Sequence, residues 1–326
     1  MKRRITLVRR LVQVVCFALL VYGGWLWSRP VGTPLPTIEA GTPNTALYPR
    51  DRILWVSGEE SVLDVYLPIL ACRFIARRPL FKSCSLHVLS ENITWKTSLK
   101  LLIPHIAFLT VLSFAFARGW CGWVCPIGGL IDFMNGLRKL LRIPPMRVGA
   151  DWNRFLSKLR HFLLWFALAV SALIAIPALG RSGINDSLFL IYCQMCPARL
   201  VYPPLGGENP CWFDTSSGLT VFMTLVGCFV LSFVSPRLWC RVCAIGALIS
   251  YFNRGGLTAL QKRPRKCTFC GTCERVCPMD IKRVHTERKR TLVTDSQCLL
   301  CFRCVQECPE SACLTGKCAG IKIVES

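Results

Sequence analysis

Two runs of regularly spaced cysteines stand near the carboxyl end of the chain. The segments C-T-F-C-G-T-C-E-R-V-C-P and C-L-L-C-F-R-C-V-Q-E-C-P, which begin at Cys267 and Cys298, both read C-x2-C-x2-C-x3-C-P. In this pattern the first three cysteines hold one [4Fe–4S] cluster and the fourth ligates the neighbouring cluster. We therefore expect cluster 1 to be held by Cys267, Cys270, Cys273 and Cys308, and cluster 2 by Cys298, Cys301, Cys304 and Cys277. Zinc sites use pairs of cysteines or cysteine–histidine pairs, and would not need this repeated pattern.

The last sixty or so residues resemble the two-cluster bacterial ferredoxins over their whole length. That resemblance implies a small α+β domain with two [4Fe–4S] clusters as cofactors. Such a domain carries single electrons, at potentials set by burial, hydrogen bonds to sulfur and local charge. Its role then depends on its partners.

A second cysteine pattern occurs twice, each time after an apolar segment. The phrases "GWCGWVCPIGGLIDF" and "LWCRVCAIGALISYF" carry Cys121, Cys125, Cys240 and Cys243. If both phrases reach the same membrane face, four thiolates could hold a third iron–sulfur cluster or another soft metal. In the alternative interpretation, these cysteines are small packing residues at a helix interface. The sequence leaves both interpretations open.

The composition indicates a membrane protein. The chain has 326 residues, of which 52% are hydrophobic and 18% are charged, and its mean hydropathy is +0.43. A helix that crosses the core of a bilayer needs roughly 17–25 mainly apolar residues. Four windows predict four transmembrane helices: 11–27, 101–117, 161–179 and 219–235.

Lysine and arginine residues predict the orientation of these helices. Basic residues are concentrated in segments 1–10, 138–160 and 254–266, which the positive-inside rule places on the cytoplasmic side. Attraction of these segments to anionic lipid, at about 1 kcal/mol per residue, explains much of the net charge of +22. The sequence shows no nucleic-acid-binding module.

The predicted fold class is an α-helical membrane protein with four transmembrane helices and a carboxy-terminal α+β two-cluster ferredoxin domain. Its predicted location is the bacterial inner membrane, with the amino terminus and the ferredoxin domain in the cytoplasm. The expected regions are a basic segment and anchor (1–28), an outside loop (29–100), a membrane domain with the repeated cysteines (101–260) and the ferredoxin domain (261–326).

Further cysteines fall in the predicted outside loops. In an oxidising compartment, where disulfides persist, Cys72 and Cys84 would suit a structural disulfide. The C-x2-C-P motif at Cys193 and Cys196 would form a disulfide, an exchangeable dithiol or a metal gate. We predict no role for Cys313 or Cys318, which match no cluster spacing.

The chain as a whole resembles the NapH-type membrane polyferredoxins over roughly residues 101–309. The resemblance rests on four spans, "GWCGWVCP" after the second, a related motif after the fourth, and the two-cluster tail. Parts of the pattern are shared by the methylamine-utilisation ferredoxin-type proteins, the membrane regulator of nitrous oxide reductase and the cytochrome oxidase assembly ferredoxin. The second family motif is normally C-x3-C-P, whereas Cys240 and Cys243 are one residue closer together and Ala244 replaces the proline.

The resemblance implies electron transfer between the quinone pool, or a cytoplasmic donor, and a protein redox partner. Two other functions stay open. An assembly or maturation factor would reduce a metal such as copper, or a thiol, with Cys193 and Cys196 as its working end. A redox-sensing membrane regulator would signal through the clusters without net electron flow.

Overall fold

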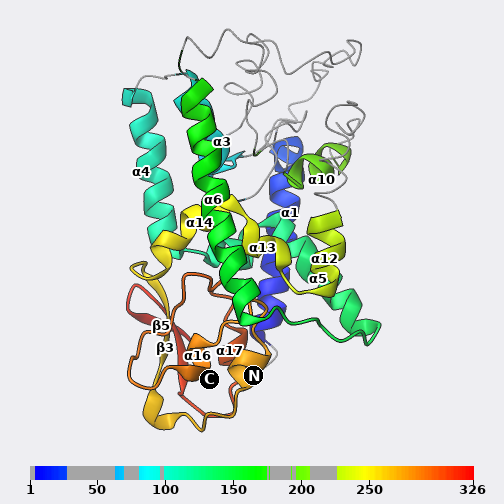
Figure 1. The fold of residues 1–326 in the computed structure, drawn as a ribbon, viewed down its shortest axis with the longest axis vertical. Coiled ribbons are helices and arrows are strands. Elements are labelled where there is room, and N and C mark those ends of the chain that lie inside the picture. The colour runs from blue at the N-terminus through cyan, green and yellow to red at the C-terminus, as the bar shows by residue number, and fades with distance from the viewer. Residues whose placement is uncertain are drawn as a thin grey trace.

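A computed structural model of the protein describes residues 4–27, 63–69, 81–95, 99–174, 176, 192, 196–205 and 226–326. Long helices run side by side above a smaller domain formed by the carboxyl end of the chain (Figure 1). These helices are α1 (Arg4–Trp27), α4 (Leu99–Phe116) and α6 (Ala150–Ile174). The amino-terminal end of α1 lies against the carboxy-terminal domain, where the N–H and hydroxyl of Thr6 donate to Gln306 Oε1 at 3.0 and 2.6 Å.

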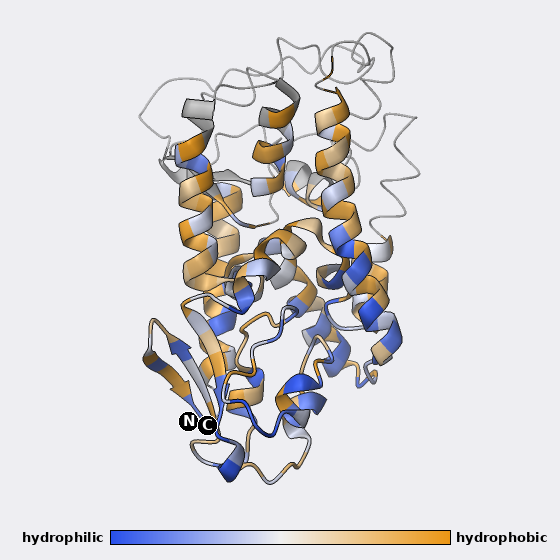
Figure 2. Ribbon diagram, turned by 60° about the vertical axis from the view of Figure 1, so that its left-hand side comes forward, coloured by the Kyte–Doolittle hydropathy of each residue, from blue (hydrophilic) through white to orange (hydrophobic). Residues whose placement is uncertain are grey.

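Two of the described helices are long and apolar enough to cross a bilayer. They cover Ile5–Tyr22 in α1 and Ala150–Ile174 in α6, and α4 has a shorter apolar stretch at Ile103–Phe116. Many apolar side chains of these helices face outward, including Leu11, Val111 and Trp165, and the upper helices are mainly hydrophobic in Figure 2. The prediction of four transmembrane helices is therefore supported for two of them.

The fourth predicted span is only partly described. Its carboxyl end consists of a π-helical turn, η2 (Val226–Val230), followed by the short helix α12 (Leu231–Val234). Two strands, β1 (Leu63–Leu67) and β2 (Phe81–Ser83), form a small parallel sheet. Helices α3 (Ser85–Trp95) and α10 (Ala198–Leu205) complete the described part on that side of the molecule.

Each copy of the repeated cysteine phrase forms two short helical segments joined at a cysteine. The first copy consists of the π-helix η1 (Trp120–Val124) and α5 (Pro126–Leu140), which meet at Cys125. The second consists of α13 (Leu238–Val242) and α14 (Ala244–Ser250), which meet at Cys243. A short 3-10 turn, η3 (Tyr251–Asn253), follows α14 and leads to the carboxy-terminal domain.

The carboxy-terminal domain is α+β, as predicted. Strands β3 (Thr258–Lys262), β4 (Leu314–Cys318) and β5 (Ile321–Glu325) form an antiparallel sheet in the order β3-β4-β5. Between β3 and β4 the chain forms short turns of helix: η4 (Pro264–Lys266), α15 (Thr272–Arg275), α16 (Arg283–Thr286) and α17 (Arg303–Gln306). Gly316 lets β4 pack on the Phe302 ring, because a Cβ at Gly316 would lie 2.6 Å from that ring.

Candidate iron–sulfur sites

The structure brings the thiols of each predicted cluster set to a cavity of its own. One cavity is lined by all four predicted ligands of cluster 1, namely Cys267, Cys270, Cys273 and Cys308. A second cavity is lined by the predicted ligands of cluster 2, namely Cys277, Cys298, Cys301 and Cys304. The fourth cysteine of each run therefore crosses to the other run's cavity. Cys273 lines both cavities, so the two adjoin.

The backbone of the two cysteine runs curls in the same way around the two cavities. Phe269 and Gly271 in the first run have φ of +53° and +72°, and the equivalent Leu300 and Phe302 in the second have φ of +49° and +52°. Left-handed positions are uncommon outside glycine. Their recurrence at matching places shows a loop geometry that turns successive backbone groups inward, as in anion-binding nests.

The buried thiols fit a cationic metal group. Burial raises the pKa of Cys277 to about 12 and raises the pKa of Cys304 well above its ordinary value. Such thiols stay protonated unless a metal displaces the proton, and a coordinating thiol is deprotonated outright. Each cavity therefore offers four thiol donors and a curled loop, which suits a [4Fe–4S] cluster; the ligand assignments stay predictions.

Two neighbours of the cluster 1 cavity were not foreseen. Lys262 is buried in its wall, and its Nζ donates to the carbonyls of Val284, His285 and Glu287 at 2.9–3.1 Å. Cys313, for which no role was predicted, is 2% exposed and also lines this cavity. Neither residue belongs to the cysteine pattern, so spacing alone could not reveal them.

The two copies of the repeated phrase are in contact, and an arginine of each copy donates a hydrogen bond to the other copy. Arg118 precedes Cys121 by three residues, and its Nη2 donates to the Cys240 carbonyl at 2.9 Å. Arg237 precedes Cys240 by three residues, and its Nη1 donates to the Cys121 carbonyl at 2.8 Å. This reciprocal pairing brings the first cysteines of both copies together. The motif R-x-W-C, present in both copies, is the sequence signal that could have identified these arginines.

A π-helical turn compensates for the difference in cysteine spacing between the copies. In the first copy the Cys125 N–H donates to the Trp120 carbonyl at 2.8 Å, five residues back. In the second copy the Cys243 N–H donates to the Trp239 carbonyl at 3.0 Å, four residues back. One extra residue in a single turn is the usual form of a π-bulge. The shorter second motif therefore leaves Cys243 in the position equivalent to Cys125.

The four repeat cysteines lie near an unpaired cation. Cys121 is close enough to Cys240 and Cys243 to interact electrostatically, and Cys125 and Cys243 share one hydrophobic core. Arg160 on α6 is fully buried and none of its guanidinium nitrogens has a hydrogen-bond partner. It interacts electrostatically with Arg118, Asp295, Cys121 and Cys243. Among the described residues, no three histidine, cysteine, aspartate or glutamate side chains could hold a single metal ion.

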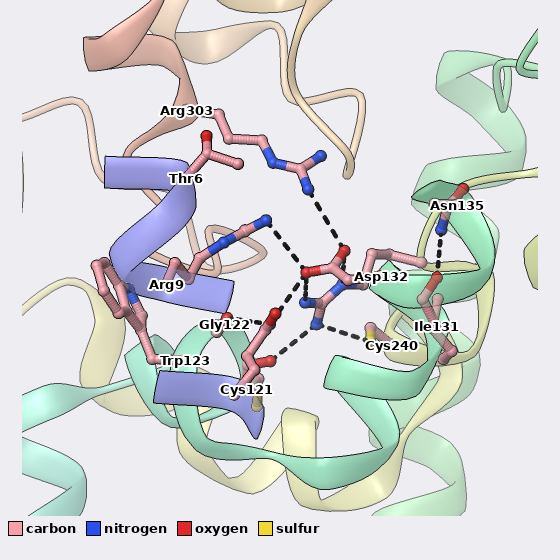
Figure 3. Close-up of polar contacts among 12 residues, drawn as sticks. Thr6, Arg9, Cys121, Gly122, Trp123, Ile131, Asp132, Asn135, Cys240 and Arg303 are labelled. Carbon is pink, nitrogen blue, oxygen red and sulfur yellow. Dashed lines mark hydrogen bonds and ion pairs between the residues drawn. The ribbon is translucent and has the colours of Figure 1, made fainter. Parts of the chain in front are cut away.

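A buried carboxylate joins the first helix, the repeat and the ferredoxin domain. Figure 3 shows Asp132 of α5 facing arginines from three other parts of the chain. Its oxygens lie 2.6 Å from Arg237 Nη2, 3.2 Å from Arg9 Nη2 and 3.5 Å from Arg303 Nη2. Gln13 Nε2 also donates to Asp132 at 3.0 Å. Burial alone would raise the pKa of Asp132, but the arginines outweigh burial and hold that pKa well below its ordinary value.

The cluster 2 loop packs directly on the first copy of the repeat. A Cβ at Gly122 would overlap the Leu299 carbonyl oxygen, so glycine is required for this approach. The Trp123 indole N–H donates to the Leu300 carbonyl at 2.9 Å. Buried Cys240, Met279 and Leu299 form a small core, against which Cys121, Cys277 and Cys298 pack. Cysteines of the repeat and of cluster 2 thus share one core.

The cysteines of the predicted outside loops are described only in part. Cys72, Cys193 and Cys211 lie outside the described residues, so the predicted disulfide and dithiol stay predictions. Cys84 and Cys196 are buried in the same hydrophobic core as the repeat cysteines Cys125 and Cys243. The structure therefore packs these two loop cysteines next to the repeat.

The comparisons with known families match both cysteine patterns. The model of the 4Fe-4S dicluster domain matches residues 259–309, which hold both cysteine runs. The model of the 4Fe-4S binding domain matches residues 101–144 and 217–267, which hold both copies of the repeated phrase. Together with the two cavities, these matches define an iron–sulfur protein of the ferredoxin type.

Several known proteins are similar to the chain. One uncharacterized protein of Methanocaldococcus jannaschii is 30% identical, over 62% of this chain and 65% of its own length. A second uncharacterized protein of the same organism is 29% identical, over 68% of this chain and 82% of its own length. The ferredoxin-type protein NapH of Escherichia coli is 28% identical, over 62% of this chain and 63% of its own length. The methylamine utilization ferredoxin-type protein MauN and the regulatory protein NosR also match.

These relatives confirm the resemblance to the NapH-type polyferredoxins, a group of ferredoxin-type electron-transport proteins. The chain spans slightly less than two thirds of the first relative, 65% of its length. No solved structure matches the chain.

Proposed function

We propose that this chain is a membrane-bound electron-transfer protein that connects the quinone pool, or a cytoplasmic donor, with a protein redox partner. The observation that carries the proposal is the contact between the cluster 2 loop and the repeat. Leu299 packs against Gly122, and Cys121 and Cys240 pack in one core with Cys277 and Cys298. A [4Fe–4S] cluster bound at these sites supplies one-electron chemistry.

The residues of the chain then have distinct roles. The eight cysteines of the tail would hold clusters 1 and 2, and Cys121, Cys125, Cys240 and Cys243 would hold a third cluster; the described residues offer no single-metal site there. Arg118 and Arg237 position the two halves of that third site by donating to each other's copy. Arg160 supplies a buried positive charge beside two of its thiols, which suits an anionic iron–sulfur centre.

The test is a count of iron and acid-labile sulfide after anaerobic purification in detergent, together with EPR of the reduced protein. Three clusters would give about twelve iron atoms per chain, and two would give about eight. We expect Cys121→Ser and Cys240→Ser to lower the count from about twelve toward eight. The control is Cys318→Ser, which lines neither cavity. A wild-type count of about eight, unchanged in both variants, would refute the third cluster.

Quinone involvement needs a separate measurement. A reduced quinol analogue added to the oxidised protein should produce the same EPR signals that dithionite produces. If the quinol analogue does not reduce the oxidised clusters and the oxidised quinone analogue does not reoxidise the dithionite-reduced clusters, the quinone part of the proposal fails.

A second function is favoured by the buried cysteines above the repeat. Cys84 and Cys196 share a core with Cys125, Cys228 and Cys243, which would suit a thiol-reducing or metal-reducing maturation factor. In that case Cys196→Ser should abolish activity toward the target enzyme while the chain keeps its full iron content. Retention of that activity in Cys196→Ser would exclude this function.

A further inference from the structure

The two ends of the ferredoxin domain differ in what they face. The cluster 2 loop is covered by the repeat, where Leu299 and Leu300 are 2% and 1% exposed. The cluster 1 loop is open, and Thr268, Phe269 and Cys270 are all exposed. Cluster 1 is therefore the site that a soluble molecule could approach.

Basic side chains surround this open loop. We call Arg265, Lys266, Arg275 and Arg288 the basic face. Arg265 and Lys266 directly precede Cys267, and both are exposed. Arg275 Nη2 donates to Thr272 Oγ1 at 2.9 Å, beside Cys273. The guanidinium of Arg288 lies 4.7 Å from the centre of the Phe269 ring. All four charges are thus held beside the cluster 1 loop.

Acidic residues do not neutralise the basic face. Between Arg263 and Arg290 the chain carries nine basic and three acidic residues. Of these acids, Asp280 is paired with Arg241 at 2.7 Å, and Glu287 accepts the backbone N–H groups of Lys289 and Arg290. The third, Glu274, precedes Arg275 in α15. Glu310 is the acidic residue that lines the cluster 1 cavity. Over the equivalent residues around the cluster 2 run, 294–321, the chain carries two basic residues and three acidic ones, and one of the two basic residues, Arg303, faces Asp132.

Attraction to anionic lipid, expected from the sequence for segment 254–266, is weakened at Arg265 and Lys266 by their place in the domain. Strand β3 leads away from the helices, and the turn at Pro264–Lys266 lies at the foot of the domain (Figure 1). Lipid attraction acts within about a Debye length of the bilayer surface, and this turn lies on the side of the domain away from α1 and α6 (Figure 1).

We propose that the basic face docks an acidic, soluble one-electron carrier protein over cluster 1; this inference rests on the proposed electron-transfer function. In one encounter a reduced carrier loses one electron and the oxidised cluster-bearing domain gains one, with no proton or group transferred. Complementary charge steers such encounters and raises association rates by 10- to 1,000-fold at low salt. The exposed Cys270 and Phe269 would lie at the centre of the contact.

The experiment uses the full-length cluster-loaded protein in detergent and reduced flavodoxin, a strongly acidic one-electron carrier. Stopped-flow absorbance gives the second-order rate of flavodoxin oxidation at low salt and at about 0.5 M salt. We expect Lys266→Gln with Arg288→Gln to slow the low-salt rate about 5- to 20-fold and to have little effect at high salt, where charge is screened. The matched control is Arg254→Gln with Lys322→Gln, at exposed basic residues away from the face, which should change the rate less than about twofold.

The outcomes separate this inference from the proposed function. Methyl viologen radical, a small reductant, should reduce all variants to the same final extent. If viologen reduces the clusters but the rate of flavodoxin oxidation does not depend on salt or on the Lys266→Gln and Arg288→Gln substitutions, the docking inference fails and the electron-transfer function stands. A second outcome would also refute the inference and assign the face to lipid. In it, the Lys266→Gln with Arg288→Gln variant loses binding to phosphatidylglycerol vesicles while its flavodoxin rate is unchanged. If no reductant reduces the clusters, both proposals fail.

Discussion

Replacing the buried carboxylate of Asp132 should destabilise the junction between the membrane helices and the ferredoxin domain. Asp132→Asn keeps the shape of the side chain but removes its charge. Arg9 and Arg237, each 1% exposed, then lose the ion pairs at 3.2 and 2.6 Å that compensate their burial. Arg303, 19% exposed, can turn toward water and adds little.

Breaking a buried ion pair by removing one partner costs about 3–5 kcal/mol. For a chain of this size, roughly 2–3 °C of midpoint is lost per kcal/mol, so Asp132→Asn should lower the unfolding temperature by about 6–15 °C. The measurement is tryptophan fluorescence of the purified protein on heating in detergent. The control is Asp151→Asn, because Asp151 is 96% exposed and lies 3.8 Å from an exposed Arg154; its change should stay within about 1 °C.

The pH dependence of this difference follows from the lowered pKa of Asp132. A carboxylate with a depressed folded-state pKa stabilises the fold above its unfolded pKa, near 3.9, and loses that contribution only as the pH falls through the folded value. The difference between wild type and Asp132→Asn should therefore be constant from about pH 5 to pH 9. A midpoint change under about 2 °C, or a difference that disappears by pH 6, would refute the reasoning.

Two further substitutions test the repeat and its contact with the ferredoxin domain. Gly122→Ala should push the Leu299 loop away and make the linker near Gly256 more sensitive to protease. The control Gly149→Ala should not change this sensitivity, because its added Cβ would meet no atom within 4 Å. Equal digestion of both variants would argue against this contact. Arg160→Met should lower the iron content from about twelve toward eight atoms per chain, because the buried guanidinium would no longer balance an anionic centre. A more stable variant with unchanged iron would mean that Arg160 faces no bound anion.

Local spacing along the chain was enough to predict the cluster cavities. The ligands of a ferredoxin cluster come from one short loop and one nearby cysteine, so a pattern such as Cys267 to Cys277 already defines the site. These thiols line the two cavities, and their assignment as cluster ligands remains a prediction. The α+β fold of the tail was implied by its resemblance to the two-cluster bacterial ferredoxins. Four membrane spans were predicted from composition, of which the described residues support two.

Other features could be recognised only in the tertiary structure. Arg118 and Arg237 each donate to the other copy of the repeat. Three arginines from distant parts of the chain converge on Asp132, and Cys313 is buried in the wall of the cluster 1 cavity. No local pattern sets which charges face one another once helices have packed. The π-turn at Trp120–Val124 is another such feature. In the sequence, the shorter spacing of Cys240 and Cys243 is a departure from the family pattern. The folded backbone shows that the π-turn in the first copy absorbs the extra residue, so that Cys125 and Cys243 occupy equivalent positions.

The sequence alone therefore determined the chemistry, because iron–sulfur ligation depends on residue type and on spacing within a short loop. Tertiary structure decided how the sites are connected. It placed the cluster 2 loop against Gly122 and left the cluster 1 loop facing solvent beneath Arg288. Those placements result from the packing of whole elements, in which buried charges must find partners and backbones must approach without overlap.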